Sequence, residues 1–535
     1  MQKIATLILT FICISFARAQ VPVLQFENSY GGSNIDRGFS ILQTKDGGFI
    51  TAGETRSNDG QVHGNHAVGE PDFWVVKLSK AGKIQWQTPL GGTNDETAFC
   101  IQQTDDGGYI VAGQANSDDG QVTGNHGVLD FWVVKLDSTG HLVWQRSLGG
   151  SKNDFATNIQ QTKDGGYIVV GGSHSNDGDV TKHHGYDLYS DYWIVKLDAA
   201  GNKQWARTYG GSYGDVAMSV IQINDGSYIV AGNSASNDGD VTNVHDSVYG
   251  DAWIIKLDKK GKLLWQKTYG GSDYEQANSI VQTKDGGFAF AGWSRSYNNG
   301  DVKGSHGNYD FWVLKLDSVG TLVWQKPLGG SNGDLAYSIQ QTKDKGYVVA
   351  GGTVSTDGQV TGLHGSREDF WVVKLDNTGT LQWQKTLGGS EIEEGRSVDQ
   401  TTDGGYIIAG WSGFSNVNNG DVTGNHGNYD VWIAKLSVTG GSAVETAINT
   451  KTQTARLNVS PNPASDVLDI HVVNAATNIS LHVTNKNGSL VFQKDLSGPT
   501  GEYYRSIDIR QFQPGLYYVT LNFGDTVLTR AFIKQ

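Results

Sequence analysis

The sequence has 535 residues, of which 72 are glycine, 8 are proline and 10% are aromatic, and its formal net charge is −14 at pH 7. Disordered glycine-rich chains lack aromatics, so this composition indicates a packed β protein whose glycines lie in turns. The acidic balance argues against nucleic acids and anionic membranes as partners, because phosphate binding needs clustered Lys and Arg.

The first 19 residues have the pattern of a secretory signal peptide. Lys3 supplies the positive charge, residues 4–16 are apolar, and residues 17–19 read Ala-Arg-Ala, a small-x-small cleavage site. We predict cleavage between Ala19 and Gln20. The loss of two positive charges lowers the net charge of the mature chain to −16.

The mature chain is expected to have neither a disulfide nor a membrane span. Cleavage leaves Cys100 as its only cysteine, so an intramolecular disulfide cannot form. A secreted protein of this length is then stabilised by its core and sheets. No later segment approaches the ~20 apolar residues of a membrane helix.

A unit of about 60 residues recurs seven times within residues 20–441. Each unit starts at a Gly-Gly pair, whose first residues are Gly31, Gly91, Gly149, Gly210, Gly270, Gly329 and Gly388. Each also contains Asp-x-Trp, which ends at Trp74, Trp132, Trp193, Trp253, Trp312, Trp371 and Trp432. A period of this length, made only of short strands, predicts an all-β, seven-bladed β-propeller.

Four strands are predicted in each unit. In the second unit they are residues 99–104, 109–113, 131–136 and 142–145. Tight Asp-Gly turns follow the first and third strands, whereas a long loop, residues 117–128, follows the second. Antiparallel order places the long loops and the Gly-Gly loops on one face, which is the default binding face.

The two ends of the array predict how the ring closes. The last unit stops after residues 431–436 and lacks a fourth strand. Residues 23–29 precede the first Gly-Gly pair, with Phe26 where other units have tryptophan. We expect this N-terminal strand to complete the seventh blade and close the ring.

The long loops are rich in Asp and Asn, and calcium is the cofactor that such loops would hold. The candidate metal ligands are Asp177, Asp179, Asp238 and Asp240. Calcium takes six to eight oxygen ligands, which loops of this kind can supply. The alternative, which we favour, is that these side chains bond to the backbone of their own loops.

Three further positions carry the same residue type in all seven units. An acid follows each Gly-Gly pair: Asp36, Glu96, Asp154, Asp215, Glu275, Asp334 and Glu393. The long loops contain His66, His126, His184, His245, His306, His364 and His426. Asp72, Asp130, Asp191, Asp251, Asp310, Asp369 and Asp430 precede the third strands. A catalytic site needs one asymmetric constellation, so sevenfold residues are expected to tie loops to blades.

Asymmetry singles out the fifth and seventh units. Only these have tryptophan at the end of the second strand, Trp293 and Trp411, and their following loops are longer and contain Tyr297 and Phe414. Exposed aromatics beside Asn and Asp suit a carbohydrate site, in which a flat apolar face meets the sugar ring. The alternative is packing between blades.

The chain changes character after the repeats. Residues 442–456 have no strand pattern and are predicted to be a linker. Residues 457–535 contain several alternating strands and predict a small β-sandwich. The expected strands are residues 468–472, 480–484, 490–493, 516–521 and 526–532.

Two segments resemble known families. Residues 136–144 and their six relatives resemble the tryptophan-docking repeat of quinoprotein-type propellers. The tail resembles the type A C-terminal sorting domain of the type IX secretion system through residues 459–468 (VSPNPASDVL), 507–519 and 532–535. This resemblance implies secretion and sorting machinery as partners, export through the periplasm across a Gram-negative outer membrane, removal of the tail, and either release or surface attachment.

The most consistent function is non-catalytic binding or adhesion outside the cell, with a carbohydrate or protein ligand. A hydrolase that uses two ring acids, such as Asp154 and Asp215, is the first alternative. A structural surface-layer component is the second. With Cys100 alone, the adjacent cysteines of quinoprotein dehydrogenases are missing, and no serine-hydrolase, zinc-protease or phosphate-loop motif occurs.

Overall fold

A computed structural model describes residues 21–67, 69–186, 188–245, 249–413, 419–438, 456–460, 464–475, 479–486, 489–496, 501–523 and 526–534. These residues form two compact units, Met1–Ser442 and Ala443–Gln535. None of them is helical, so none forms a helix long and apolar enough to cross a membrane. The predicted cleavage site at Ala19 and Gln20, Phe414 and residues 442–455 lie outside the described residues.

The first unit contains, in its described part, seven four-stranded antiparallel sheets, called sheets 1 to 7 and given from the centre outwards. Sheet 1 contains β2 (Asp36–Gln43), β3 (Phe49–Thr55), β4 (Asp72–Leu78) and β5 (Ile84–Leu90), and sheet 2 contains β6 (Glu96–Gln103), β7 (Tyr109–Ala115), β8 (Asp130–Leu136) and β9 (Leu142–Leu148). Sheet 3 contains β10 (Asp154–Gln161), β11 (Tyr167–Ser173), β12 (Asp191–Leu197) and β13 (Lys203–Tyr209). Sheet 4 contains β14 (Asp215–Gln222), β15 (Tyr228–Ser234), β16 (Asp251–Leu257) and β17 (Leu263–Tyr269). Sheet 5 contains β18 (Glu275–Gln282), β19 (Phe288–Ser294), β20 (Asp310–Leu316) and β21 (Leu322–Leu328). Sheet 6 contains β22 (Asp334–Gln341), β23 (Tyr347–Thr353), β24 (Asp369–Leu375) and β25 (Leu381–Leu387). Sheet 7 contains β26 (Ile392–Gln400), β27 (Tyr406–Gly413), β28 (Tyr429–Ser437) and β1 (Val23–Tyr30).

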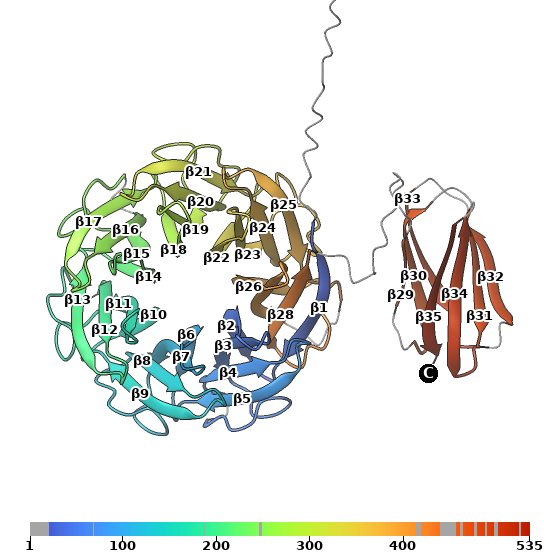
Figure 1. The fold of residues 1–535 in the computed structure, drawn as a ribbon, viewed down its shortest axis with the longest axis horizontal. Coiled ribbons are helices and arrows are strands. Elements are labelled where there is room, and N and C mark those ends of the chain that lie inside the picture. Colours follow the sequence, from blue (N-terminus) through green and yellow to red (C-terminus); the bar gives the residue numbers. More distant parts are fainter. Residues whose placement is uncertain are drawn as a thin grey trace, which may run out of the picture. The chain divides into compact units, whose positions relative to one another are not determined.

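These sheets surround a central opening, and the first strand of each lies beside it (Figure 1). The arrangement is the propeller-like, all-β fold that the repeats predict. The second and third strands of each sheet are almost wholly buried, because β-branched and aromatic residues on both of their faces pack against the neighbouring sheets. Each apolar core therefore lies between two adjacent sheets; one such core joins Val75 of sheet 1 to Val111 of sheet 2.

The predicted pairing of the N-terminal strand with the last repeat is present. β1 runs antiparallel to β28, and Ser29 lies opposite Trp432. Trp432 Nε1 donates a hydrogen bond to Glu27 Oε2 at 2.8 Å. In sheet 1 the corresponding tryptophan, Trp74, donates to Gln87 of its own fourth strand at 2.7 Å. The N-terminal strand thus takes the place of a fourth strand in sheet 7.

The second unit consists of two sheets. One contains β29 (Arg456–Ser460), β30 (Val467–Ala475) and β33 (Gly501–Asp508), and the other β32 (Leu490–Leu496), β31 (Ile479–Asn485), β34 (Gly515–Phe523) and β35 (Thr526–Lys534). Leu468 and Ile507 of the first sheet share a buried cluster with Leu481, Val519 and Phe532 of the second. Two sheets packed over one apolar core form a small β-sandwich.

Candidate functional site: the central cavity

Each innermost strand carries a β-bulge at the same place. In β2 the register with β3 shifts between Gly38 and Ser40, and the same shift recurs in the other six sheets. A bulged residue has no partner on the neighbouring strand, and bulges re-aim side chains, often beside active sites. The seven bulged residues, from sheet 1 to sheet 7, are Phe39, Phe99, Thr157, Met218, Asn278, Tyr337 and Arg396.

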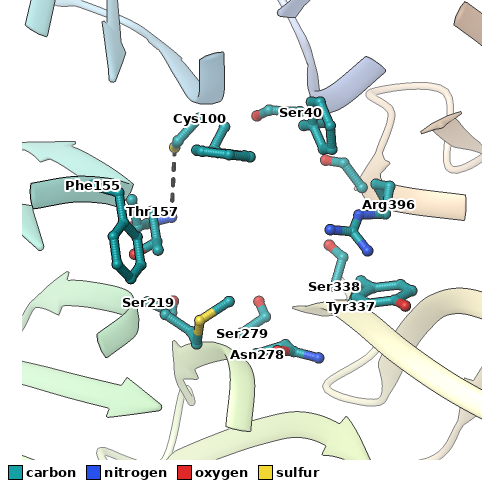
Figure 2. Close-up of a pocket in the computed structure, with 15 residues that line it drawn as sticks. Ser40, Cys100, Phe155, Thr157, Ser219, Asn278, Ser279, Tyr337, Ser338 and Arg396 are labelled. Carbon is teal, nitrogen blue, oxygen red and sulfur yellow. Dashed lines mark hydrogen bonds between the residues drawn. The ribbon is translucent and has the colours of Figure 1, made fainter. Parts of the chain in front are cut away.

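These side chains line a cavity of about 340 Å³ in the central opening. Figure 2 shows the labelled lining residues grouped around it, with the Arg396 guanidinium directed inwards. The other lining residues, all from innermost strands, are Ser40, Cys100, Phe155, Asn158, Ser219, Ser279, Ser338 and Ser397. The volume lies within the range of small-molecule sites.

The cavity wall has two chemically different arcs. Sheets 1 to 4 contribute the large apolar side chains Phe39, Phe99, Phe155 and Met218, with Thr157 as the polar bulged residue of sheet 3, whereas sheets 5 to 7 contribute the polar bulged residues Asn278, Tyr337 and Arg396. The residue type at the bulged position therefore differs around the ring, although the same bulge recurs in every sheet; Phe155 alone of these residues precedes the bulge of its strand. A fold requirement alone would be met by one residue type at all seven positions.

Hydrogen bonds at the cavity wall tie each innermost strand to the next. Ser219 Oγ accepts a hydrogen bond from the backbone N–H of Ile280 at 3.2 Å. Ser397 Oγ of sheet 7 likewise accepts from Ile41 of sheet 1, at 3.1 Å. Ser40, Ser279 and Ser338 make equivalent bonds. These bonds fix the backbone that carries the bulged residues.

Arg396 is held by two neighbours. Its Nη1 donates to Glu394 Oε1 at 2.6 Å, and its guanidinium carbon lies 3.9 Å from the centroid of the Tyr337 ring. Its side chain is 25% exposed. Burial, and secondarily the charge of Glu394, raises the pKa of nearby Glu368 to about 8. Among the residues that line the cavity, Arg396 alone is charged.

Trp411 lies in a different environment from the exposed one that we expected. It is only 8% exposed, because it packs edge-on against Phe39 with 5.4 Å between ring centroids. The guanidinium carbons of Arg37 and Arg396 lie 5.4 Å and 5.3 Å from its ring. This ring therefore positions cavity residues and offers no open face for a sugar.

Trp293 belongs to a separate aromatic cluster in sheet 5. It stacks on Tyr274 at 4.7 Å and meets Tyr309 edge-on at 5.2 Å. Tyr297, in the following loop, is 70% exposed. Among the described residues no ring contact joins Trp293 to Trp411, so the structure does not bring the two into one site.

The side chains of the sevenfold acids and histidines form hydrogen bonds within the loops, as the repeats predict. At the junction of sheets 1 and 2, Glu96 Oε2 accepts from the N–H of Gly92 at 2.8 Å. Asp72 Oδ2 accepts from the backbone N–H of His66 at 3.0 Å and contacts its ring Nδ1 at 2.5 Å. Asp154 and Asp215, the acid pair considered for hydrolysis, each accept hydrogen bonds from a Gly-Gly loop and a serine.

These junctions bury two carboxyl groups against one glycine. An ideal Cβ on Gly91 would lie 2.4 Å from Glu96 Oε2 and 2.5 Å from Asp72 Oδ1. Asp72 Oδ1 is buried and, like the equivalent oxygen at each other junction, has no hydrogen-bond donor. Burial is the main cause that raises the pKa of Glu96 to about 7. The first glycine of each pair is therefore required by the packing of the two acids.

The candidate calcium ligands are engaged in loop contacts. Asp177 Oδ1 accepts from the N–H of Ser151 at 2.7 Å, and Asp238 accepts from the N–H and hydroxyl of Ser212. Asp179 pairs with Lys203, and Asp240 accepts a long bond from Gly210 at 3.4 Å. In the described part of the chain no three His, Cys, Asp or Glu side chains are grouped to hold a metal ion.

Sequence reasoning missed the cavity, although the repeats contain a signal for it. The bulged residue always lies three positions after the sevenfold acid, as Phe39 follows Asp36 and Arg396 follows Glu393. The position before it is always Gly or Ala. A variable position among regular ones marks the side chains that the fold leaves free for another purpose.

Comparison with known proteins identifies the second unit. Residues 458–535 match the family described as a secretion system C-terminal sorting domain. This is the sorting domain of the type IX secretion system, as the tail motifs predict, and it directs proteins to the cell surface or the extracellular space. The secretion machinery is therefore a partner of this chain.

Three further proteins show similarity to this chain. The regulatory protein FlaEY of Caulobacter vibrioides is 26% identical over 251 residues, 45% of this chain, which spans about a quarter of that relative (25%). PorZ, a surface component of the type-IX secretion system of Porphyromonas gingivalis, is 13% identical with a TM-score of 0.37 over 96% of this chain and 61% of that chain. A puromycin hydrolase is 10% identical with a TM-score of 0.43 over 83% and 62%. At these TM-scores the likenesses do not define a function.

Proposed function

We propose that this chain is an exported, non-catalytic binding protein whose ligand occupies the central cavity. The observation that carries the proposal is the set of seven equivalent bulges that present seven positions of unlike chemistry. The cavity also combines an apolar arc with a few oriented polar groups, which is typical of ligand sites. A glycan end or a protein segment is the ligand class expected from an extracellular location.

Filling the cavity tests this proposal. Met218→Trp adds a large ring at a half-buried cavity position, whereas Leu264→Trp adds the same ring on the outer strand β17, where Leu264 is 52% exposed. Both variants are screened against glycan and peptide arrays. We expect binding to be lost in Met218→Trp and kept in Leu264→Trp; equal binding by both would refute a cavity site.

We infer that the ring is a closed propeller of seven blades. The support is that one aromatic contact recurs at every junction: Trp86 meets Tyr109 at 5.8 Å, and Phe26 of β1 meets Phe49 of β3 at 6.2 Å. Removing residues 21–30 exposes the edge of β28 and opens the ring. Loss of the sharp thermal transition, with association of the truncated chain, is expected; a monomer of unchanged stability would contradict closure.

A carbohydrate site at sheet 5 is a second candidate. Tyr297 is 70% exposed and lies beside Asn298 and Asn299, next to the Trp293 cluster. Tyr186, which is 71% exposed on a loop of sheet 3, provides a matched control. Loss of glycan binding in Tyr297→Ala but not in Tyr186→Ala would assign this site; no loss in either would remove it.

A further inference from the structure

The cavity wall carries one charge and many hydrogen-bond donors. Arg396 is the only charged side chain among the lining residues, and none of them is acidic. This differs from the balance of the whole chain, whose formal net charge is −14. Arg396 is already ion-paired with Glu394, which does not line the cavity, and its remaining N–H donors favour a ligand with a negative group because charge-assisted hydrogen bonds are the strong ones.

The guanidinium of Arg396 is fixed but mostly unused. A guanidinium has five N–H donors, and within the described residues Arg396 makes one hydrogen bond, to Glu394 at 2.6 Å. Tyr337 covers the group at 3.9 Å. Glu394 does not line the cavity. Glu394 and Tyr337 therefore orient the guanidinium of Arg396, and its remaining N–H donors match the geometry of a carboxylate.

Serine hydroxyls add further donors. Ser219, Ser279 and Ser338 each accept a backbone N–H of the next sheet, at 3.2 to 3.3 Å. In the described part of the chain none of these three hydroxyls donates to a protein acceptor, so each O–H can donate a hydrogen bond to a ligand in the cavity. A ligand with several hydrogen-bond acceptors and few hydrogen-bond donors therefore fits this wall.

Four large apolar side chains also line the cavity, in sheets 1 to 4, together with the polar Thr157 and Asn158 of sheet 3. Phe39 and Phe99 meet edge-on at 5.2 Å, and Phe155 and Met218 continue the arc through sheets 3 and 4. All four side chains are half-buried, so part of each faces the cavity. An apolar body on this arc would place a terminal acceptor group towards Arg396.

We propose that the cavity recognises a small carboxylate with an apolar body, in which Arg396 pairs with the carboxylate and the arc of Phe39, Phe99, Phe155 and Met218 holds the body. The proposal rests on the proposed function of the cavity and names its ligand class. Glu394 and Tyr337 act as positioning residues. A cavity of about 340 Å³ limits the bound part to a small molecule or the end of a larger one.

The test compares a carboxylate with its amide on the intact secreted protein. Isothermal titration measures 3-phenylpropionate, 3-phenylpropionamide and N-acetylphenylalanine against the unsubstituted chain, Arg396→Gln and Arg207→Gln. Arg207 is a matched control, since it lies on the outer strand β13 beside Trp205. We expect the acids to bind at least ~10-fold tighter than the amide, and Arg396→Gln to weaken them ~10- to ~100-fold, the loss of a charge-assisted pair. Arg207→Gln should leave the affinity unchanged.

The outcomes separate this proposal from the one on which it rests. Equal affinity for acid and amide, or an Arg396→Gln variant that binds normally, overturns the carboxylate class. If no acid binds while another ligand is lost in Met218→Trp, this inference is wrong and the cavity site stands. If Arg396→Gln does not fold, Arg396→Lys replaces it, because lysine keeps the positive charge but lacks the two-pronged guanidinium. The comparison of the acid with the amide needs no variant at all. Tighter binding of N-acetylphenylalanine than of 3-phenylpropionate would assign a peptide C-terminus as the source of the carboxylate.

Discussion

The Gly-Gly junctions predict a large stability cost for one added methyl group. In Gly91→Ala the new Cβ would lie 2.4 Å from Glu96 Oε2 and 2.5 Å from Asp72 Oδ1, closer than real side chains approach. Both carboxyl groups must move, which breaks at least two hydrogen bonds to charged groups at about 1.5–3 kcal/mol each. We therefore expect the free energy of unfolding to fall by about 3–6 kcal/mol, or roughly 3–7 °C in Tm for a cooperative unit of about 420 residues.

Guanidinium unfolding followed by tryptophan fluorescence measures this cost, and Gly107→Ala is the matched control. Gly107 has φ of +85°, and nothing lies within 4 Å of its Cβ position. Alanine there costs only the backbone strain of the left-handed region, about 1–2 kcal/mol. If Gly91→Ala costs no more than Gly107→Ala, the buried acids do not require the glycine and the reasoning fails.

Three further predictions follow from buried polar groups. Folding raises the pKa of Glu96 and of Glu393 from 4.5 to about 7, so between these pH values the folded protein binds more protons than the unfolded chain. Its stability therefore falls as the pH rises through this range, and its Tm should be lower at pH 8 than at pH 5.5. A higher Tm at pH 8 would contradict this prediction. Burial raises the pKa of the Cys100 thiol to about 11, so little thiolate is present at pH 8 although Cys100 lines the cavity, and Ellman's reagent should react more slowly with the native than with the unfolded protein. Equal rates would contradict the raised pKa. Trp193 Nε1 is buried without a partner because Ala206 occupies the position at which sheets 1, 2, 4, 5 and 6 have glutamine and sheet 7 has Glu27. Ala206→Gln should therefore raise the free energy of unfolding by about 1 kcal/mol, and a loss of stability would show that the amide does not reach the indole.

The fold could be predicted because its determinants are local and repeated. Asp-Gly turns, β-branched runs and the Asp-x-Trp segment recur at fixed spacing, and each specifies a strand or a turn without reference to distant residues. The pairing of β1 with β28 followed from counting strands at the two ends. The sorting tail was recognisable from its motifs, which the family match at residues 458–535 supports independently.

The site was harder to predict because it depends on features that single positions do not reveal. Trp411 is an unusual residue at its repeat position, yet Phe39 and two arginines from other strands enclose it. Its burial follows from contacts with its own sheet and with the adjacent sheet 1, which residue type alone does not specify. The bulge that turns Arg396 towards the cavity is equally invisible in a strand pattern, because one extra residue changes the direction of a side chain without changing the composition.

A crystal structure of the secreted protein with its bound ligand tests the central claim most directly. The account predicts that the ligand lies in the central cavity and touches bulged residues from both arcs, Arg396 on one side and Phe99 on the other. A ligand bound on the loop face beside Tyr297, with an empty cavity, would contradict it.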